Sequence, residues 1–125
     1  MNENEISHKI IGASIELHKT LGPGLLENAY EKALAYDLKE LGLIVDTQVP
    51  IDLVYKGLNI ENAYKIDILV NDLVIIELKS VEALAPVYFA QTLTYLKLSG
   101  KKLGLLINFN TETLKNGIHR IVNKL

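Results

Sequence analysis

Cysteine and tryptophan are absent from this chain of 125 residues, which has a single methionine and only three prolines. The lack of cysteine excludes a disulfide framework, a thiolate zinc site and a cysteine nucleophile. It also fits a reducing compartment, so we expect a cytoplasmic protein. No apolar run approaches the ~20 residues that a membrane helix needs, and the polar segment Met1 to Ser7 differs from a signal peptide. We therefore expect no membrane contact.

Positive charge is also scarce. The sequence has 13 lysines and arginines against 15 aspartates and glutamates, which gives a formal net charge of −2. Domains that bind nucleic acid by electrostatics alone are usually basic, so that class is disfavoured unless a local patch or metal ions supply positive charge. The chain length and the 49% hydrophobic content predict one domain, residues 1–125, with its own core.

Hydrophobic periodicity predicts three helices. Apolar residues recur every three or four positions over Glu5–Thr20 and Leu25–Leu41, and a Gly-Pro-Gly sequence separates the two stretches. Gly42 suits the C-cap of the second helix. The third helix is expected to have Pro86 in its first turn and Gly100 at its C-cap.

Extended structure is expected where β-branched residues and alternation replace the helical period. The predicted segments are Leu43–Thr47, Ile51–Tyr55, Leu58–Tyr64, Tyr64–Val70, Val74–Lys79 and the apolar run Leu103–Phe109. Pro50 is tolerable only at a sheet edge or a break, and Lys56-Gly57 is a plausible hairpin turn. The tail Thr111–Leu125 stays open, because its apolar residues fit a helix that Gly117 interrupts. The order of elements predicts an α/β domain.

Three charged residues interrupt the two most apolar strands: Asp67, Glu77 and Lys79. An unpaired ion within a sheet costs several kcal/mol, so such strands usually keep charges for a reason. Side chains alternate along a strand, which places Glu77 and Lys79 on one face.

The apolar pattern also predicts how these strands pair. A two-residue turn at Asn71-Asp72 would mix charged and apolar side chains on both faces of the hairpin. A connection of three residues leaves one face wholly apolar, with Val70 opposite Val74, Ile68 opposite Ile76 and Ile66 opposite Leu78. Because the hydrophobic pattern sets register, we predict the second arrangement. Asp67 then lies opposite Glu77, with Cβ atoms roughly 4.5–5.5 Å apart.

Two adjacent carboxylates repel each other unless a cation lies between them. Oxygen ligands from Asp67 and Glu77 suit Mg²⁺ or Mn²⁺, and an ion held in this way can activate water and polarise a phosphoryl oxygen. Lys79 would orient that water or stabilise the developing charge. The pattern indicates metal-dependent phosphodiester hydrolysis; the alternative is a cross-strand ion pair on a solvated face.

Asp67, followed on the next strand by Glu77-Leu78-Lys79, resembles the PD-(D/E)XK nuclease superfamily. The segment from Gly24 to Tyr30 resembles the signature of the small GxxExxY family, although Lys65-Ile66 stands where superfamily motifs often have proline. The resemblance implies a restriction-endonuclease-like αβββαβ core with a mixed central sheet flanked by helices, in agreement with the order of elements. It also implies Asp67 and Glu77 as metal ligands and Lys79 as the catalytic lysine.

Two more residues are candidates for this site. The resemblance implies Glu27 as a third metal-binding carboxylate; its alternative role is a helix-dipole partner worth ~0.3–1 kcal/mol. Tyr30 lies three residues further on the same helix face, where it would hold Glu27 or pack beneath it. Gln91 and Tyr95 lie one helical turn apart and resemble the QxxxY motif of RecB-type nucleases. The amide of Gln91 would donate to a phosphate or a ligand water; its alternative is a solvated glutamine beside a core tyrosine.

The leading hypothesis is a Mg²⁺- or Mn²⁺-dependent nuclease whose partner is nucleic acid, with DNA favoured and a homodimer allowed. The alternative is a non-catalytic nucleic-acid-binding or protein-interaction domain that retains the fold. A basic rim would support contact with phosphates, although charge runs are usually solvated faces. Its candidates are Lys97, Lys101, Lys102, Lys115, His119 and Arg120.

Overall fold

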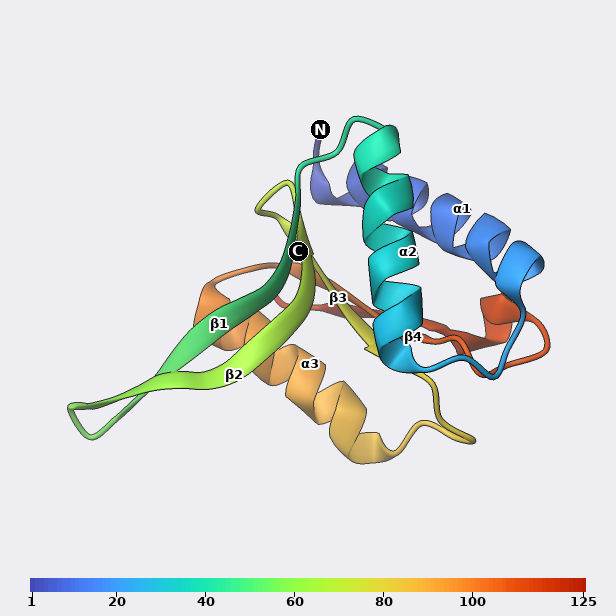
Figure 1. Cartoon of the computed structure of the whole chain (residues 1–125). Coiled ribbons are helices and arrows are strands. Elements are labelled where there is room, and N and C mark those ends of the chain that lie inside the picture. Colours follow the sequence, from blue (N-terminus) through green and yellow to red (C-terminus); the bar gives the residue numbers. More distant parts are fainter.

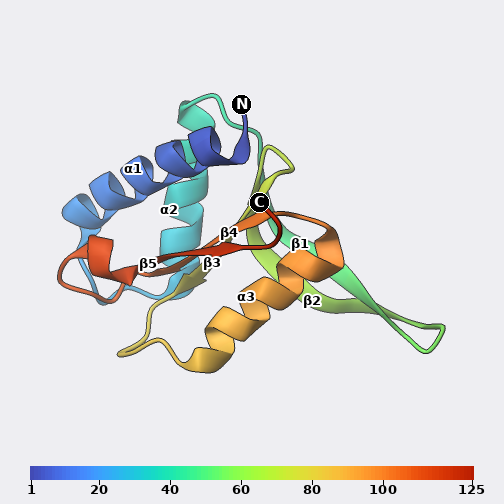
Figure 2. The same ribbon diagram turned by 180° about the vertical axis from the view of Figure 1, so that it is seen from behind.

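A five-stranded mixed sheet forms the centre of the computed structural model, which describes residues 1–125. The strands lie in the order β1-β2-β3-β4-β5, and only β3 and β4 run parallel to each other. Helices α1 and α2 cover one face, and α3 covers the other (Figures 1 and 2). The elements are α1 (Glu3–Leu21), α2 (Glu27–Glu40), β1 (Val45–Tyr55), β2 (Leu58–Val70), β3 (Val74–Lys79), α3 (Pro86–Ser99), β4 (Leu103–Asn108), the short 3₁₀ helix η1 (Leu114–Gly117) and β5 (Ile118–Val122).

This architecture confirms the predicted α/β class and is consistent with the restriction-endonuclease-like core. The β4 strand is buried along its whole length, as its continuous apolar sequence predicts. None of the helices combines the length and the hydropathy that crossing a membrane requires.

Strands β1 and β2 form a long antiparallel ribbon whose tip extends beyond the other strands (Figure 1). The two segments predicted on either side of Pro50 are one continuous strand. Its pairing with β2 shifts register between Ile51 and Leu53. Because β1 lies at the sheet edge, Pro50 occupies a position where its missing N–H is tolerated. The predicted turn at Lys56-Gly57 is confirmed, with positive φ at both residues.

The C-terminal segment, which the sequence left open, forms η1 and the edge strand β5. Gly117 lies at the junction between them. A side chain there would collide with the backbone carbonyl of Asn108, so the close approach of the two segments requires glycine. Ile118 then pairs with Ile107 of β4 and begins the fifth strand.

Candidate active site

The hairpin between β2 and β3 has the predicted three-residue connection, with Val70 opposite Val74 and Ile68 opposite Ile76. The regular pairing ends there, one residue before the two acids. The backbone N–H of Asp67 donates a hydrogen bond to Glu77 Oε1 at 3.2 Å. The N–H of Leu78 donates to Asp67 Oδ2 at 2.9 Å. Each carboxylate therefore takes the place of a backbone acceptor, and the two acids lie together where the strands separate.

The predicted continuation of this ladder, with Ile66 opposite Leu78, is wrong. Ile66 packs in the core beneath α3, whereas Ile68 and Leu78 pack in the core beneath α1 and α2. The N–H of Leu78 is bonded to the Asp67 carboxylate and not to β2 backbone. Strand β2 therefore loses its simple alternation at Asp67.

Glu77 is buried, with 6% of its surface exposed. Burial raises the pKa of Glu77 to about 9, and the neighbouring charge of Asp67 acts in the same direction. The ammonium group of Lys79 opposes this shift more weakly. Glu77 is therefore protonated near neutral pH when no cation is present, which removes the repulsion between the two acids.

Lys79 does not face the acids as an ion-pair partner. Its Nζ atom lies 4.5 Å from the ring centroid of Tyr88 in α3, and it forms an ion pair with neither Asp67 nor Glu77. The half-buried Tyr88 is a site residue that the sequence did not reveal. Tyr88 lies three residues before Gln91 on the same helix, and this spacing is the sequence signal that could have identified it.

Helix α3 presents Tyr88, Gln91 and Tyr95 on one face, because three or four residues complete a helical turn. Burial raises the pKa of the Tyr95 hydroxyl, and the nearby charges of Glu77 and Asp67 raise it further. Gln91 lies between the two tyrosines in sequence and is half-buried, but its side chain makes no hydrogen bond within the chain. The structure thus places Gln91 on the expected helix face without joining it to the acids.

Glu27 shares a cavity of about 160 Å³ with Asp67, between the start of α2 and strand β3. Glu31, one turn further along α2, lines the same cavity and was not among the predicted site residues. Burial raises the pKa of Glu31, and the charges of Asp67 and Glu27 contribute in the same direction. A hydrogen bond of 2.6 Å from Gln48 Nε2 to Glu31 Oε1 opposes the shift. The four-residue spacing of Glu27 and Glu31 puts both on one face of α2, and this is the sequence signal that could have identified Glu31.

Tyr30 does not hold Glu27. Its ring is fully buried and stacks on Phe109, with 4.5 Å between the ring centroids. Its hydroxyl donates to the carbonyl of Gly22 at 2.5 Å and accepts from the N–H of Leu25 at 3.2 Å. Tyr30 therefore fixes the turn that precedes α2. Because Glu27 is the first residue of α2, this turn also sets the position of Glu27.

The model of the PD-(D/E)XK nuclease superfamily matches residues 4–121, almost the whole chain. The chain belongs to this superfamily. It matches no curated protein and no solved structure. Superfamily membership supports a nuclease-type hydrolase and a nucleic-acid substrate, and nucleases of this group generally use divalent metals.

The metal set expected for a superfamily nuclease is not preassembled. No three histidine, aspartate or glutamate side chains converge closely enough to hold an ion, so the predicted set of Asp67, Glu77 and Glu27 does not form one. The donors nevertheless fit a hard cation. Mg²⁺ is commonly bound through one or two carboxylates, with waters and substrate phosphates as its other ligands. The adjoining oxygens of Asp67 and Glu77 supply such a pair.

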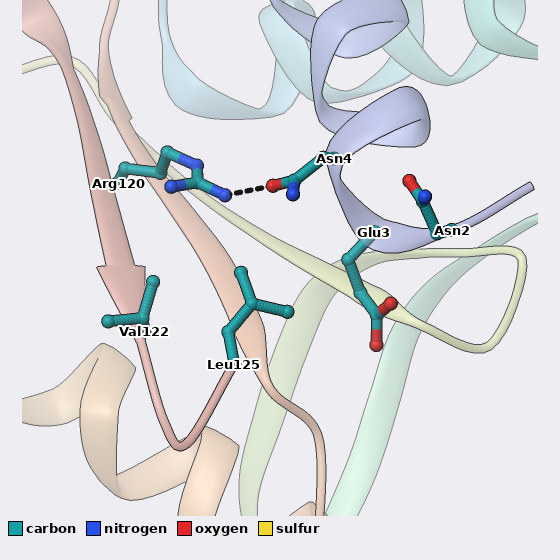
Figure 3. Close-up of a pocket in the computed structure, with 6 residues that line it drawn as sticks. All are labelled: Asn2, Glu3, Asn4, Arg120, Val122 and Leu125. Atoms are coloured by element: carbon teal, nitrogen blue, oxygen red, sulfur yellow. Dashed lines mark hydrogen bonds between the residues drawn. The ribbon is translucent and has the colours of Figure 1, made fainter.

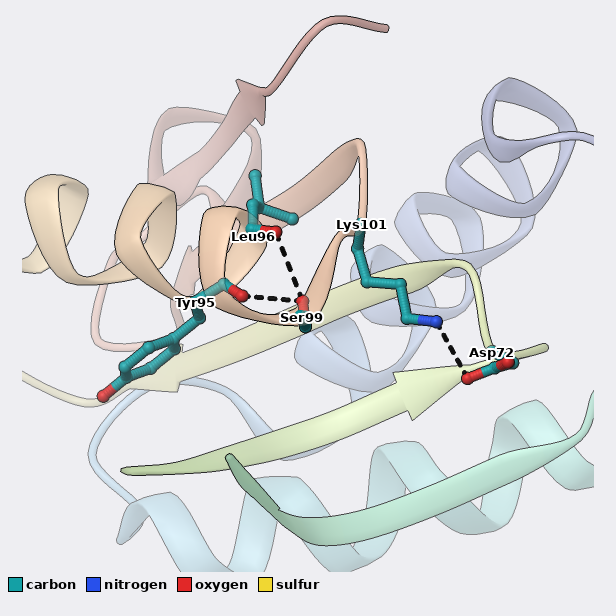
Figure 4. Close-up of polar contacts among 5 residues, drawn as sticks. All are labelled: Asp72, Tyr95, Leu96, Ser99 and Lys101. Carbon is teal, nitrogen blue, oxygen red and sulfur yellow. Dashed lines mark hydrogen bonds and ion pairs between the residues drawn. The ribbon is translucent and has the colours of Figure 1, made fainter. Parts of the chain in front are cut away.

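Two members of the predicted basic rim make polar contacts away from the acid pair. Lys101 forms an ion pair of 3.0 Å with Asp72, at the other end of β3 from Glu77 (Figure 4). Arg120 hydrogen-bonds to Asn4 in a separate cavity of about 630 Å³ beside the N-terminal helix (Figure 3). Lys101 and Arg120 are therefore engaged away from the acid pair.

Proposed function

We propose that this chain is a divalent-metal-dependent nuclease of the GxxExxY family that hydrolyses phosphodiester bonds in nucleic acid, with DNA the favoured substrate. The observation that supports this most is the side-by-side placement of Asp67 and Glu77 on a split hairpin. Lys79 follows two residues later. A pair of acids of which one is buried (Glu77) and the other half-buried (Asp67) is costly for a fold to retain without a role, and a cation is what such a pair binds best.

In this proposal Asp67 and Glu77 hold the metal, and Glu27 approaches it from across the shared cavity. The bound Mg²⁺ or Mn²⁺ would lower the pKa of a water and polarise a phosphoryl oxygen. Glu77 would hold the ion as a carboxylate, with its proton released to solvent. Lys79 would leave the Tyr88 ring and donate a hydrogen bond to the attacking water or to the developing charge on the phosphate. Gln91, whose amide has no partner within the chain, donates to a phosphate oxygen.

A second candidate is a binding domain that keeps the fold without catalysis. The observation that favours it is the absence of three converging metal ligands. A divalent-ion titration by calorimetry separates the two, because a nuclease site binds the ion and a relic need not. Light scattering on the same sample tests whether the chain forms the homodimer that the leading hypothesis allows.

The decisive experiment is a cleavage panel of plasmid, single-stranded DNA and RNA with Mg²⁺, with Mn²⁺ and with a chelator. We expect cleavage that needs the metal and is lost in Asp67→Asn. The matched control is Asp46→Asn, an exposed acid on β1 that makes no side-chain hydrogen bond or ion pair. Cleavage in the chelator would overturn metal dependence. A wild-type protein that neither cleaves nor binds the metal would leave the binding domain as the function.

A further inference from the structure

A groove of about 440 Å³ adjoins the site cavity and runs between α2 and the edge strand β1. The two cavities have Asn28, Glu31 and Gln48 in common, so they are adjacent. The other residues along the groove are Lys32, Ala35, Tyr36, Lys39 and Thr47. We propose that this α2–β1 groove binds a single strand of nucleic acid next to the bond that is cut. The inference rests on the proposed function and names the form of its substrate.

The groove contains two ammonium groups that have no acidic partner and can bind phosphates. Lys32 and Lys39 are exposed, and neither forms an ion pair within the chain. They lie seven residues apart on one side of α2, a separation of ~10.5 Å along the helix axis. That separation places the two ammonium groups against different phosphates of one strand. In a chain of net charge −2, these ammonium groups offset the repulsion between a phosphate backbone and the acids of the site.

Tyr36 lies between the two lysines and is 64% exposed. Its ring has no aromatic neighbour within the chain, and its hydroxyl makes no hydrogen bond. A large aromatic side chain left open beside cationic residues is the combination that binds single strands, because every base has a face that stacks on an aromatic ring. Bases in a duplex already stack on each other, so Tyr36 favours a single strand over a duplex.

The test measures binding of a fluorescein-labelled oligothymidylate by anisotropy in a chelator, which prevents metal-dependent cleavage. We expect the double variant Lys32→Ala/Lys39→Ala to bind at least ~10-fold more weakly. The slope of log K against log salt should flatten by about 1.4, since each phosphate contact on a single strand contributes about 0.7. The control is Lys9→Ala/Lys124→Ala, which removes two exposed lysines that form no ion pair and lie outside the groove, and it should change affinity less than ~2-fold.

The aromatic contact has its own variants. Tyr36→Ala should weaken single-strand binding by about 5- to 100-fold, whereas Tyr36→Phe should retain it. Binding of a duplex with the same sequence should be equal in wild type and Tyr36→Ala. The proposal is overturned if wild type binds no single strand, if the groove variants bind like wild type, if the control weakens binding equally, or if Tyr36→Ala affects the duplex to the same extent.

This test is separate from the test of nuclease activity. Groove variants that weaken binding in a protein that cleaves nothing would overturn the nuclease proposal and keep the groove. Metal-dependent cleavage combined with unchanged binding in the groove variants would overturn the groove and keep the nuclease.

Discussion

The ammonium group of Lys79 lies over the ring of Tyr88, 4.5 Å from its centroid, although Lys79 is only two residues from the buried acid Glu77. The positive charge that would neutralise the acid pair thus contacts an aromatic ring of α3 instead. Without a metal, Glu77 avoids repulsion by retaining its proton, in accord with its raised pKa of about 9. The site in this form holds its lysine apart from its acids.

The contact between Lys79 and Tyr88 should be measurable as a coupling energy. We expect a double-mutant cycle of Lys79→Ala and Tyr88→Ala, measured by urea unfolding in a chelator, to give about 0.5–1 kcal/mol, the scale of a partly solvated cation–π pair. Tyr88→Phe keeps the ring and should preserve most of the coupling. Fully additive single variants would show that the contact contributes nothing to stability.

The protonated state of Glu77 predicts a pH-dependent stability in the metal-free protein. Its folded pKa is raised to about 9 from an ordinary value of 4.5, so between these values the folded state binds more protons than the unfolded state. Stability should therefore fall as pH rises through this window, with a limiting slope of about 1.4 kcal/mol per pH unit from this group.

Replacement of Glu77 by glutamine isolates this effect. Glu77→Gln cannot ionise, so in a chelator it should be more stable than wild type at pH 8 and should approach wild type near pH 4. Denaturant unfolding across this range measures the difference. A constant difference between the two proteins at every pH would refute the raised pKa of Glu77.

Replacement of Asp67 should impair metal binding, whereas replacement of Lys79 should impair the cleavage rate alone. Asp67→Asn should weaken Mg²⁺ binding, because it removes one of the charges that hold the ion. Lys79→Ala should bind Mg²⁺ as well as wild type or slightly better, yet cleave ~10²–10³-fold more slowly, the effect of losing one donor to the transition state. Calorimetry and cleavage rates test both halves. Wild-type cleavage by Lys79→Ala, or undiminished Mg²⁺ binding by Asp67→Asn, would contradict these roles.

The hydroxyl of Tyr30 should contribute measurably to the free energy of unfolding. Tyr30→Phe keeps the stack on Phe109 but removes the hydrogen bonds to Gly22 and Leu25. We expect a loss of about 1–2 kcal/mol in the free energy of unfolding, because two backbone groups of the turn lose their partner. The same change at exposed Tyr36 should cost almost nothing. Equal effects at the two positions would remove the structural role assigned to the Tyr30 hydroxyl.

Local patterns in the sequence determined much of the fold. The helical periods gave α1 and α2, and the apolar match of two short strands gave the pairing of Val70 with Val74 and Ile68 with Ile76. Pro50 indicated an edge or a break because a missing N–H is a property of one residue. The motif of Asp67, Glu77 and Lys79 indicated the superfamily in the same way, since its residues lie on one hairpin.

The tertiary structure decided the arrangement around that motif. Lys79 rests on Tyr88, Glu31 joins the cavity of Asp67, and Ile66 faces α3 because β2 and β3 separate at the acids. None of these relationships follows from a local period, because each depends on how α2, α3 and the sheet pack across long sequence separations. The prediction from the strand pattern required backbone pairing along the whole hairpin. Instead, the carboxylates of Asp67 and Glu77 accept hydrogen bonds from backbone amides, and the backbone pairing stops there. The sequence thus identified the candidate site residues, and packing decided which groups surround them.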